Sequence, residues 1–382
     1  TGREAALDDV LARGVAASCV EIMRGGSVAR SEAITLFHTI VDSLADRGDA
    51  GAREVEVIAR KHAAVPVLVE LMEGEMDSAL AQGMPEEAAL ALASVASTSP
   101  SLRMEVLAEG CLDRALGLFE GNVMGPAPGP RGGVLARKVS VDRCVAMLLA
   151  SICCRFPPAP GAAGGDGPAA HRGREERGEV VPLGMVRRAL PGLRDLLCCS
   201  DPQCLRYAAK AASSLLQGGD SDRTQAVLDG GLGPELCRLI TSRDREVRAS
   251  AVRAMGRVAT GSTRQTRFAA LQCGLVDQVG ALMHMIYGGP DDGGGELEAE
   301  EDLRRDLAWL VCNLAGESSL ITELYDASVL RYLVPMAGEG EAAGVRAYAV
   351  RAILLAASAG SWQATVLAGF GGARACAGVL RG

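Results

Sequence analysis

Two side chains in the stretch 302–317 have the types and spacing to bind a peptide. Its sequence, DLRRDLAWLVCNLAGE, places Trp309 and Asn313 four residues apart in an apolar helical pattern. Residues i and i+4 share one face of a helix, so the indole and the carboxamide would lie one turn apart. An indole packs along aliphatic stems, and a carboxamide can both donate to and accept from a peptide backbone. The alternative is that Trp309 is only a core residue, and this stretch alone does not decide between the two.

The sequence contains no motif for catalysis. It lacks GxSxG, a Walker loop and HExxH, and none of its residues form a credible metal cluster. The glycines at 230, 231 and 233 fit a junction between helices, where glycine relieves steric strain. We therefore expect neither an enzyme nor a cofactor or metal, and we expect surface or core roles for the histidines, His38, His62, His171 and His284.

Composition favours a protein that binds neither nucleic acid nor membranes. Hydrophobic residues make up 48% of the chain but aromatic residues only 3%, so Ala, Leu and Val must form the core. The 39 basic and 47 acidic residues give a net charge of −8, which argues against a general binder of polyanions and permits a basic partner. The longest apolar run, 144–154, is too short to span a bilayer, and no signal peptide is present.

The twelve cysteines indicate an intracellular protein with reduced thiols. They are scattered or adjacent, as at 153–154 and 198–199, lie mostly within apolar helical patterns, and form no CxxC pair. A secreted disulfide framework would be spaced differently. The start at Thr1 rather than at a methionine indicates a fragment of a longer chain.

A template of a short apolar segment, a second apolar segment and a long helix recurs along the chain. With Leu228, Leu271, Leu324 and Leu367 taken as equivalent, the repeats are spaced by 43, 53 and 43 residues, and the longer interval contains the Gly- and Asp-rich loop 288–296. Convincing strand alternation is absent. The period predicts long helices at 28–46, 86–97, 136–155, 203–217, 244–260, 302–316 and 345–358.

Interruptions of this pattern predict two loops. The stretch 156–182 is too rich in Pro, Gly and Ala to pack, so we expect a disordered insertion there, followed by a short helix pair at 183–197. A smaller loop is expected at 121–133. The whole chain, 1–382, is expected to be one solenoid of about seven to eight repeats whose first repeat is incomplete.

Units of this kind leave an apolar face uncovered and fold only when stacked. The predicted fold is therefore all-α, a right-handed superhelix whose long third helices line one concave surface. Function in solenoids lies on that surface, so the residues that the third helices turn toward it are the candidate binding residues.

Two stretches give the chain a resemblance to a known family. The stretch 251–276, AVRAMGRVATGSTRQTRFAALQCGLV, and the stretch 308–317, AWLVCNLAGE, are similar to motifs of importin alpha, which is built from armadillo repeats. The second matches the pattern W-x-x-x-N-[IL]-A-G-[DE]. The architecture matches over the whole chain, and the diagnostic motifs match over about 244–337.

The resemblance implies a nuclear import adaptor. Importin alpha binds extended Lys/Arg-rich nuclear localisation signals of cargo proteins with Trp and Asn ladders on its third helices, at a major site in early repeats and a minor site in late ones. It implies importin beta as a further partner, bound through a segment ahead of Thr1, and residence in the cytoplasm and nucleus. Carried over to this sequence, the late-repeat site would consist of Trp309, Asn313, Asp306, Arg253, Thr260 and Glu317.

Other positions depart from the family pattern. In early repeats the Trp and Asn columns contain Thr35 and Thr39, Leu90 and Ser94, and Ala146 and Ala150. In later repeats basic residues enter these columns. They are Lys210, Arg257, which replaces an Asn, and Arg351, with Ser214 and Leu355 in the remaining places. Positive charge beside a site for a basic peptide would weaken binding.

These departures leave a second function class open. The chain could be an armadillo scaffold with another ligand, such as the substrate-binding part of a U-box ubiquitin ligase. A U-box or a basic arm ahead of Thr1 would decide between the two classes.

Overall fold

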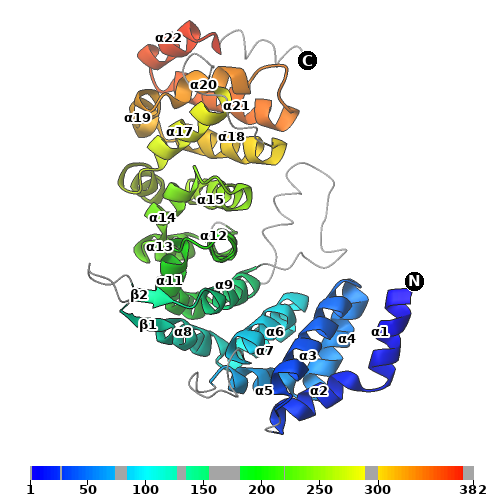
Figure 1. Cartoon of the computed structure of the whole chain (residues 1–382). Helices are drawn as coiled ribbons and strands as arrows, with labels where there is room; N and C mark the ends of the chain where they lie inside the picture. Colours follow the sequence, from blue (N-terminus) through cyan, green and yellow to red (C-terminus); the bar gives the residue numbers. More distant parts are fainter. Residues whose placement is uncertain are drawn as a thin grey trace. The chain divides into compact units, whose positions relative to one another are not determined.

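The computed structural model describes residues 2–25, 28–73, 84–126, 135–154, 181–218, 220–288 and 300–372 (Figure 1). They form two compact units, Thr1–Ala211 and Ala212–Gly382, which meet within one helix and are described separately below. Apart from one pair of short strands, the regular elements of both units are helices.

In the first unit, two short helices and one long helix alternate along the chain. The long helices α3, α6 and α9 pack side by side in that order. The elements are α1 (Gly2–Ala12), α2 (Val15–Arg24), α3 (Arg30–Ala45), α4 (Asp49–Lys61), α5 (Ala64–Leu71), α6 (Met84–Thr98), α7 (Pro100–Ala108), α8 (Cys111–Gly121), β1 (Val123–Pro126), β2 (Leu135–Arg137), α9 (Val139–Cys153), α11 (Leu183–Leu197) and α12 (Pro202–Leu215), which contains the unit boundary.

The second unit repeats the same order. Its long helices α15, α18 and α21 again pack in succession. The elements are α13 (Ser221–Asp229), α14 (Leu232–Leu239), α15 (Arg245–Val258), α16 (Thr263–Arg267), the π-helical turn η1 (Phe268–Gln272), α17 (Leu275–Tyr287), α18 (Glu301–Ala315), the 3-10 turn η3 (Ser318–Leu320), α19 (Ile321–Asp326), α20 (Val329–Met336), α21 (Ala343–Ser358) and α22 (Ser361–Gly369).

The predicted helical repeat is confirmed. Each of the seven long helices expected from the sequence is present, with ends within three residues of the predicted ones. Small side chains let these helices approach closely, because alanine adds little bulk at a contact. In α6, for example, Ala88, Ala89, Ala91, Ala93 and Ala96 are completely buried.

A left-handed residue joins the first short helix of a repeat to the second. This backbone conformation turns the chain sharply, and glycine adopts it without the steric penalty of a Cβ atom. Gly231, within the glycine cluster expected at a helix junction, has φ of 75° and precedes α14. The same place is taken by Gly14, Gly110 and Gly274, and by the non-glycine residues Ala63 and Ser328, at φ of 48° and 61°.

The loop expected at 121–133 is flanked by a short antiparallel strand pair that the sequence did not predict. Val123 pairs with Arg137 and Pro126 with Leu135. Asn122, which is only 1% exposed, links the start of β1 to the residue that follows β2. Its amide donates to the Lys138 carbonyl at 3.0 Å and its oxygen accepts from the Lys138 amide at 3.0 Å. Strands of four and three residues, the first of which contains Gly and Pro, are too short to show an alternating pattern.

The helix pair expected at 183–197 is wrong, because this stretch is the single helix α11 with Pro191 inside it. An internal proline removes one hydrogen bond and often ends a helix. Here the apolar face of α11 packs against α8 and α9, with Leu190 and Leu193 buried, and this packing keeps the helix continuous.

One predicted repeat equivalence is also wrong by a residue. Leu228, Leu324 and Leu367 are buried, as a shared core position requires, but Leu271 is 43% exposed. The buried residue at that place is Ala270. A π-helical turn holds an extra residue, so η1 rotates the following side chains away from their expected direction.

The predicted insertion 156–182 lies mostly outside the described residues. Its last two residues are described and belong to the folded unit. Val181 is buried, and Pro182 directly precedes α11.

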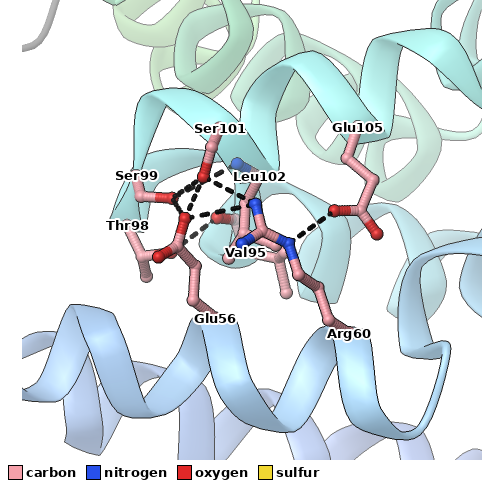
Figure 2. Close-up of polar contacts among 8 residues, drawn as sticks. All are labelled: Glu56, Arg60, Val95, Thr98, Ser99, Ser101, Leu102 and Glu105. Carbon is pink, nitrogen blue, oxygen red and sulfur yellow. Dashed lines mark hydrogen bonds and ion pairs between the residues drawn. The ribbon is translucent and has the colours of Figure 1, made fainter.

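A polar cluster connects successive repeats in the first unit (Figure 2). The Glu56 carboxylate, on α4, accepts from the Ser99 hydroxyl at 3.0 Å and also from the Ser101 hydroxyl at the start of α7. Arg60, one turn further along α4, donates to Ser101 at 2.9 Å and to Glu105 at 3.3 Å. Glu56 is therefore the shared acceptor of a contact between α4 and the start of α7.

Replacing Glu56 with alanine should lower the free energy of unfolding by about 1 kcal/mol, because two hydroxyl donors lose a charged acceptor that is only partly exposed. Glu54, on the same helix but 3.9 Å from Arg47 and more exposed, provides the matched control. Its alanine variant should change stability by less than about 0.5 kcal/mol. Urea unfolding followed by circular dichroism measures both, and equal effects would show that the cluster in Figure 2 contributes nothing special.

Candidate functional site

The third helices of the second unit carry an equivalent row of side chains. The ninth residues of α15, α18 and α21 are Arg253, Trp309 and Arg351. Four residues further along the same helices are Arg257, Asn313 and Leu355. All six are at least partly exposed, so they share the uncovered face of these helices. We call the residues Arg253, Arg257, Asp306, Trp309 and Asn313 the Trp309 surface.

Trp309 is partly buried, and Gly256 makes the room for it. A Cβ atom on Gly256 would lie 2.5 Å from Cζ3 and 2.7 Å from Cε3 of the indole, so the ring packs directly on the α15 backbone. The remaining part of the side chain is accessible. One side of the indole therefore packs on the α15 backbone at Gly256, and its accessible part offers apolar surface to a ligand.

Asn313 lies one turn beyond Trp309 and is only weakly engaged. Its Nδ2 atom is 3.5 Å from the Gly256 carbonyl oxygen, at the outer limit of a hydrogen bond. The side chain is partly exposed. Such a carboxamide can exchange this long contact for hydrogen bonds to an extended backbone.

Asp306 and Arg253, both expected to contact a ligand, bind each other. The Arg253 Nε and Nη2 atoms donate to Asp306 Oδ2 at 3.1 and 3.0 Å. Burial raises the pKa of the Asp306 carboxyl, and the Arg253 guanidinium opposes that rise without cancelling it. A lysine of a ligand would therefore have to share this carboxylate with Arg253.

Thr260 and Glu317 occupy the far ends of the two helices. Thr260 is exposed, and its hydroxyl donates to the Arg257 carbonyl of its own helix at 2.7 Å. Glu317 lies two residues beyond the end of α18, is partly exposed, and accepts from the Ser319 hydroxyl at 3.1 Å. Helix α18 thus positions Asp306, Trp309 and Asn313, with Glu317 beyond its end, and Arg253 joins them through Asp306.

Sequence reasoning missed two features of the Trp309 surface. Gly256 supports the indole, and a glycine in the middle of a helix is itself a signal of a close approach by another group. Arg257, known only as a departure from the family pattern, donates from Nη1 to the carbonyl and hydroxyl of Ser213 at 2.7 and 3.0 Å. No local pattern connects residues 44 positions apart.

The columns assigned to the early repeats need correction on α6 and α9. On α6, Ser94 is buried. Ala146 and Ala150 are buried, and the accessible residues beside them on α9 are Met147 and Ser151. The assigned columns are out of register by one residue, because Met147 rather than Ala146 is the ninth residue of α9, the place that Trp309 has in α18. Neither the assigned nor the observed residues of α9 include a Trp or an Asn, so α9 carries no rung of such a ladder.

Other chemistry is sparse in the part of the chain that the structure describes. Within it, no group of three or more His, Cys, Asp or Glu side chains could hold a metal ion, and no helix has the length and hydropathy needed to cross a membrane. The described cysteines are free thiols, and most are buried. His284 packs between helices, with Nδ1 2.8 Å from the Tyr332 hydroxyl, a partner 48 residues away.

Curated relatives of the chain are importin alpha subunits. Importin subunit alpha-2 of Arabidopsis thaliana is 28% identical over 191 residues, which cover 50% of this chain and 28% of that protein. Importin subunit alpha-1a of Oryza sativa subsp. japonica is 26% identical over 288 residues, 75% of this chain and 44% of that protein. The matched region spans less than half the length of these relatives. No protein-family model matches the chain.

Solved structures with a similar fold include designed armadillo repeat proteins. A designed armadillo repeat protein in complex with the peptide (KR)4 superposes with a TM-score of 0.53 at 17% identity, over 76% of this chain and 98% of that one. The chain is a divergent armadillo-repeat protein that resembles importin alpha. An engineered protein gives a TM-score of 0.64 at 18% identity, over 97% of this chain and 85% of that one. The armadillo fold, predicted from the sequence, is confirmed.

Proposed function

We propose that this armadillo-repeat protein is a non-enzymatic nuclear import adaptor that binds Lys/Arg-rich segments of cargo proteins on the Trp309 surface. The observation that carries the proposal is the partly exposed Trp309, supported by Gly256, with Asn313 one turn away. A lysine stem would lie along the indole with a cation–π contribution, and Asp306 or Glu317 would attract its ammonium group. Asn313 would hold the peptide backbone, and Thr260 would contribute a hydroxyl at the end of α15.

The resemblance to importin alpha extends the proposal to partners and location. We propose that the protein acts in the cytoplasm and nucleus and engages importin beta. Nucleic acid and membranes are not partners in this proposal, in keeping with the net charge of −8.

Calorimetric titration of the full chain with the peptide (KR)4 tests the proposal. We expect saturable binding that weakens as salt rises, because exposed charges are screened. A peptide of the same length with Gly and Ser in place of Lys and Arg should not bind. If (KR)4 does not bind at low salt, the proposed role in nuclear import is rejected, whereas the assignment of the armadillo fold still holds.

The arginines of the Trp309 surface favour the second function class in that event. Arg253 already occupies Asp306, and Arg257 takes the place of an Asn. If (KR)4 does not bind, we propose that the chain is an armadillo scaffold with a different ligand, such as the substrate-binding part of a U-box ubiquitin ligase.

Binding of (KR)4 should also depend on pH through Asp306. Because burial raises the pKa of this carboxyl above its ordinary value near 3.8, Asp306 becomes neutral at a higher pH than an ordinary aspartate. Affinity should fall as pH drops through that raised pKa, since a neutral carboxyl attracts the peptide less. The same shift lowers folding stability as pH rises from 3.8 to the raised pKa, because the native state there binds the proton more tightly than the unfolded chain.

Titrations at a series of pH values measure this effect, and Asp306→Asn is the control. The variant should bind more weakly near neutral pH and lack the step in affinity that Asp306 causes. An identical pH profile in both proteins would show that Asp306 does not contact the peptide.

A further inference from the structure

Arg351 continues the row of the Trp309 surface on the next helix. It is the ninth residue of α21, as Trp309 is of α18, and α21 packs against α18 as α18 packs against α15. Arg351 is exposed. A peptide that runs along Trp309 toward α21 would therefore meet its guanidinium group next.

The three arginines of this row differ in what they already bind. Arg253 pairs with Asp306, and Arg257 donates to Ser213. Arg351 makes no ion pair and no hydrogen bond with any residue that the structure describes. Its guanidinium group is exposed and is available to pair with an acidic residue of a ligand.

The neighbouring position on α21 cannot hold a peptide backbone. Leu355 stands where Asn313 stands on α18, so the pair of Trp and Asn is replaced here by an arginine and a leucine. Leu354, beside them, is 58% exposed. A peptide would be held at α21 by charge and apolar contact rather than by a carboxamide.

We propose that the ligand of this surface is a mixed-charge peptide, with a lysine or arginine on Trp309 and an aspartate or glutamate that pairs with Arg351. This inference rests on the proposed function, because it takes Trp309 and Asn313 as the peptide-binding residues. Charge complementarity supports it, since a uniformly basic peptide would place like charges side by side at α21 and an acidic residue would form an ion pair there. The charge pattern selects among extended segments rather than adding much affinity.

Three peptides of equal length with a central Lys-Arg pair test the proposal, alongside (KR)4. One has alanine on both sides, and the other two carry glutamates on the amino or the carboxyl side of the pair. One glutamate peptide should bind the wild-type chain about twofold to fivefold more tightly than the alanine peptide, as expected for a partly exposed ion pair.

Charge reversal at Arg351 identifies the residue responsible. Arg351→Glu should abolish the preference for the glutamate peptide and strengthen binding of (KR)4. Arg267→Glu, the same change at an exposed site on α16, should leave both unchanged.

Each remaining result has one meaning. Binding of (KR)4 through Trp309 without any gain from glutamate would overturn the mixed-charge proposal and leave the proposed function standing. Equal shifts in the Arg351 and Arg267 variants would also overturn it, because net charge alone would then explain them. If none of the four peptides binds, the proposed function itself fails.

Discussion

Replacing Trp309 and Asn313 together with alanine should remove most of the affinity of this protein for (KR)4. Trp309 offers an apolar ring braced on the α15 backbone, and Asn313 offers a carboxamide held by one long contact. Loss of a partly buried tryptophan at the centre of an interface costs about 2 kcal/mol or more, which is about a 30-fold loss of affinity. Calorimetric titration of the double variant measures it.

Trp362 supplies the matched control for this experiment. It is the other tryptophan of the chain, lies on α22, and packs edge-to-face with Tyr325 at a centroid distance of 5.1 Å. Its replacement with alanine removes a ring of the same size, 46% exposed, from a helix outside the Trp309 surface. Affinity for (KR)4 should be unchanged. Similar losses in the two variants would show that the Trp309 surface is not where the peptide binds.

Gly256→Ala should displace the indole without removing any group that contacts a ligand. The new methyl group would lie 2.5 Å from the ring, closer than atoms can approach, so Trp309 must move off α15. We expect about a tenfold loss of affinity for (KR)4, since a displaced ring no longer lies beside Asn313. The variant should also be destabilised by about 1–3 kcal/mol through overpacking.

Whether Gly256→Ala stabilises or destabilises the protein should depend on the presence of the Trp309 ring. In a Trp309→Ala background the clash is gone, and Gly256→Ala should stabilise the helix by up to about 1 kcal/mol, the ordinary gain of alanine over glycine. Gly117→Ala, at a helical glycine of α8 with no atom within 4 Å of the added Cβ, should be stabilising in both backgrounds. Urea unfolding measures all four combinations. A Gly256 variant with unchanged affinity would contradict the role of this packing.

The repeat architecture could be predicted because it depends on the spacing of apolar residues within each helix, which the sequence shows directly. The long helices follow from small and apolar residues at helical spacing, and α18 was found from the same pattern with its Trp and Asn. The structure differs from the predictions where a displacement of one residue changes which side chains of a helix face outward. The extra residue of η1 turns Leu271 outward, and the exposed row of α9 lies one residue beyond the predicted columns, at Met147 and Ser151.

The electrostatics of the site could not be predicted from the sequence. Arg253 and Asp306 are 53 residues apart, and only the packing of α15 on α18 brings them to 3.0 Å. The sequence predicts that Arg253 and Asp306 each contact the ligand. In the structure, the two side chains form an ion pair with each other. Gly256 could have been noticed as a helical glycine, but its partner Trp309 is visible only in three dimensions.

Fluorescence of Trp309 during titration tests peptide binding at this surface most directly. In a Trp362→Phe variant Trp309 is the only tryptophan, so any change in indole emission comes from the Trp309 surface. We expect the emission to change saturably with (KR)4, with the Kd found by calorimetry, and to return to its starting value at high salt. Calorimetric binding of (KR)4 without any change in Trp309 emission would place the peptide elsewhere and contradict the proposed site.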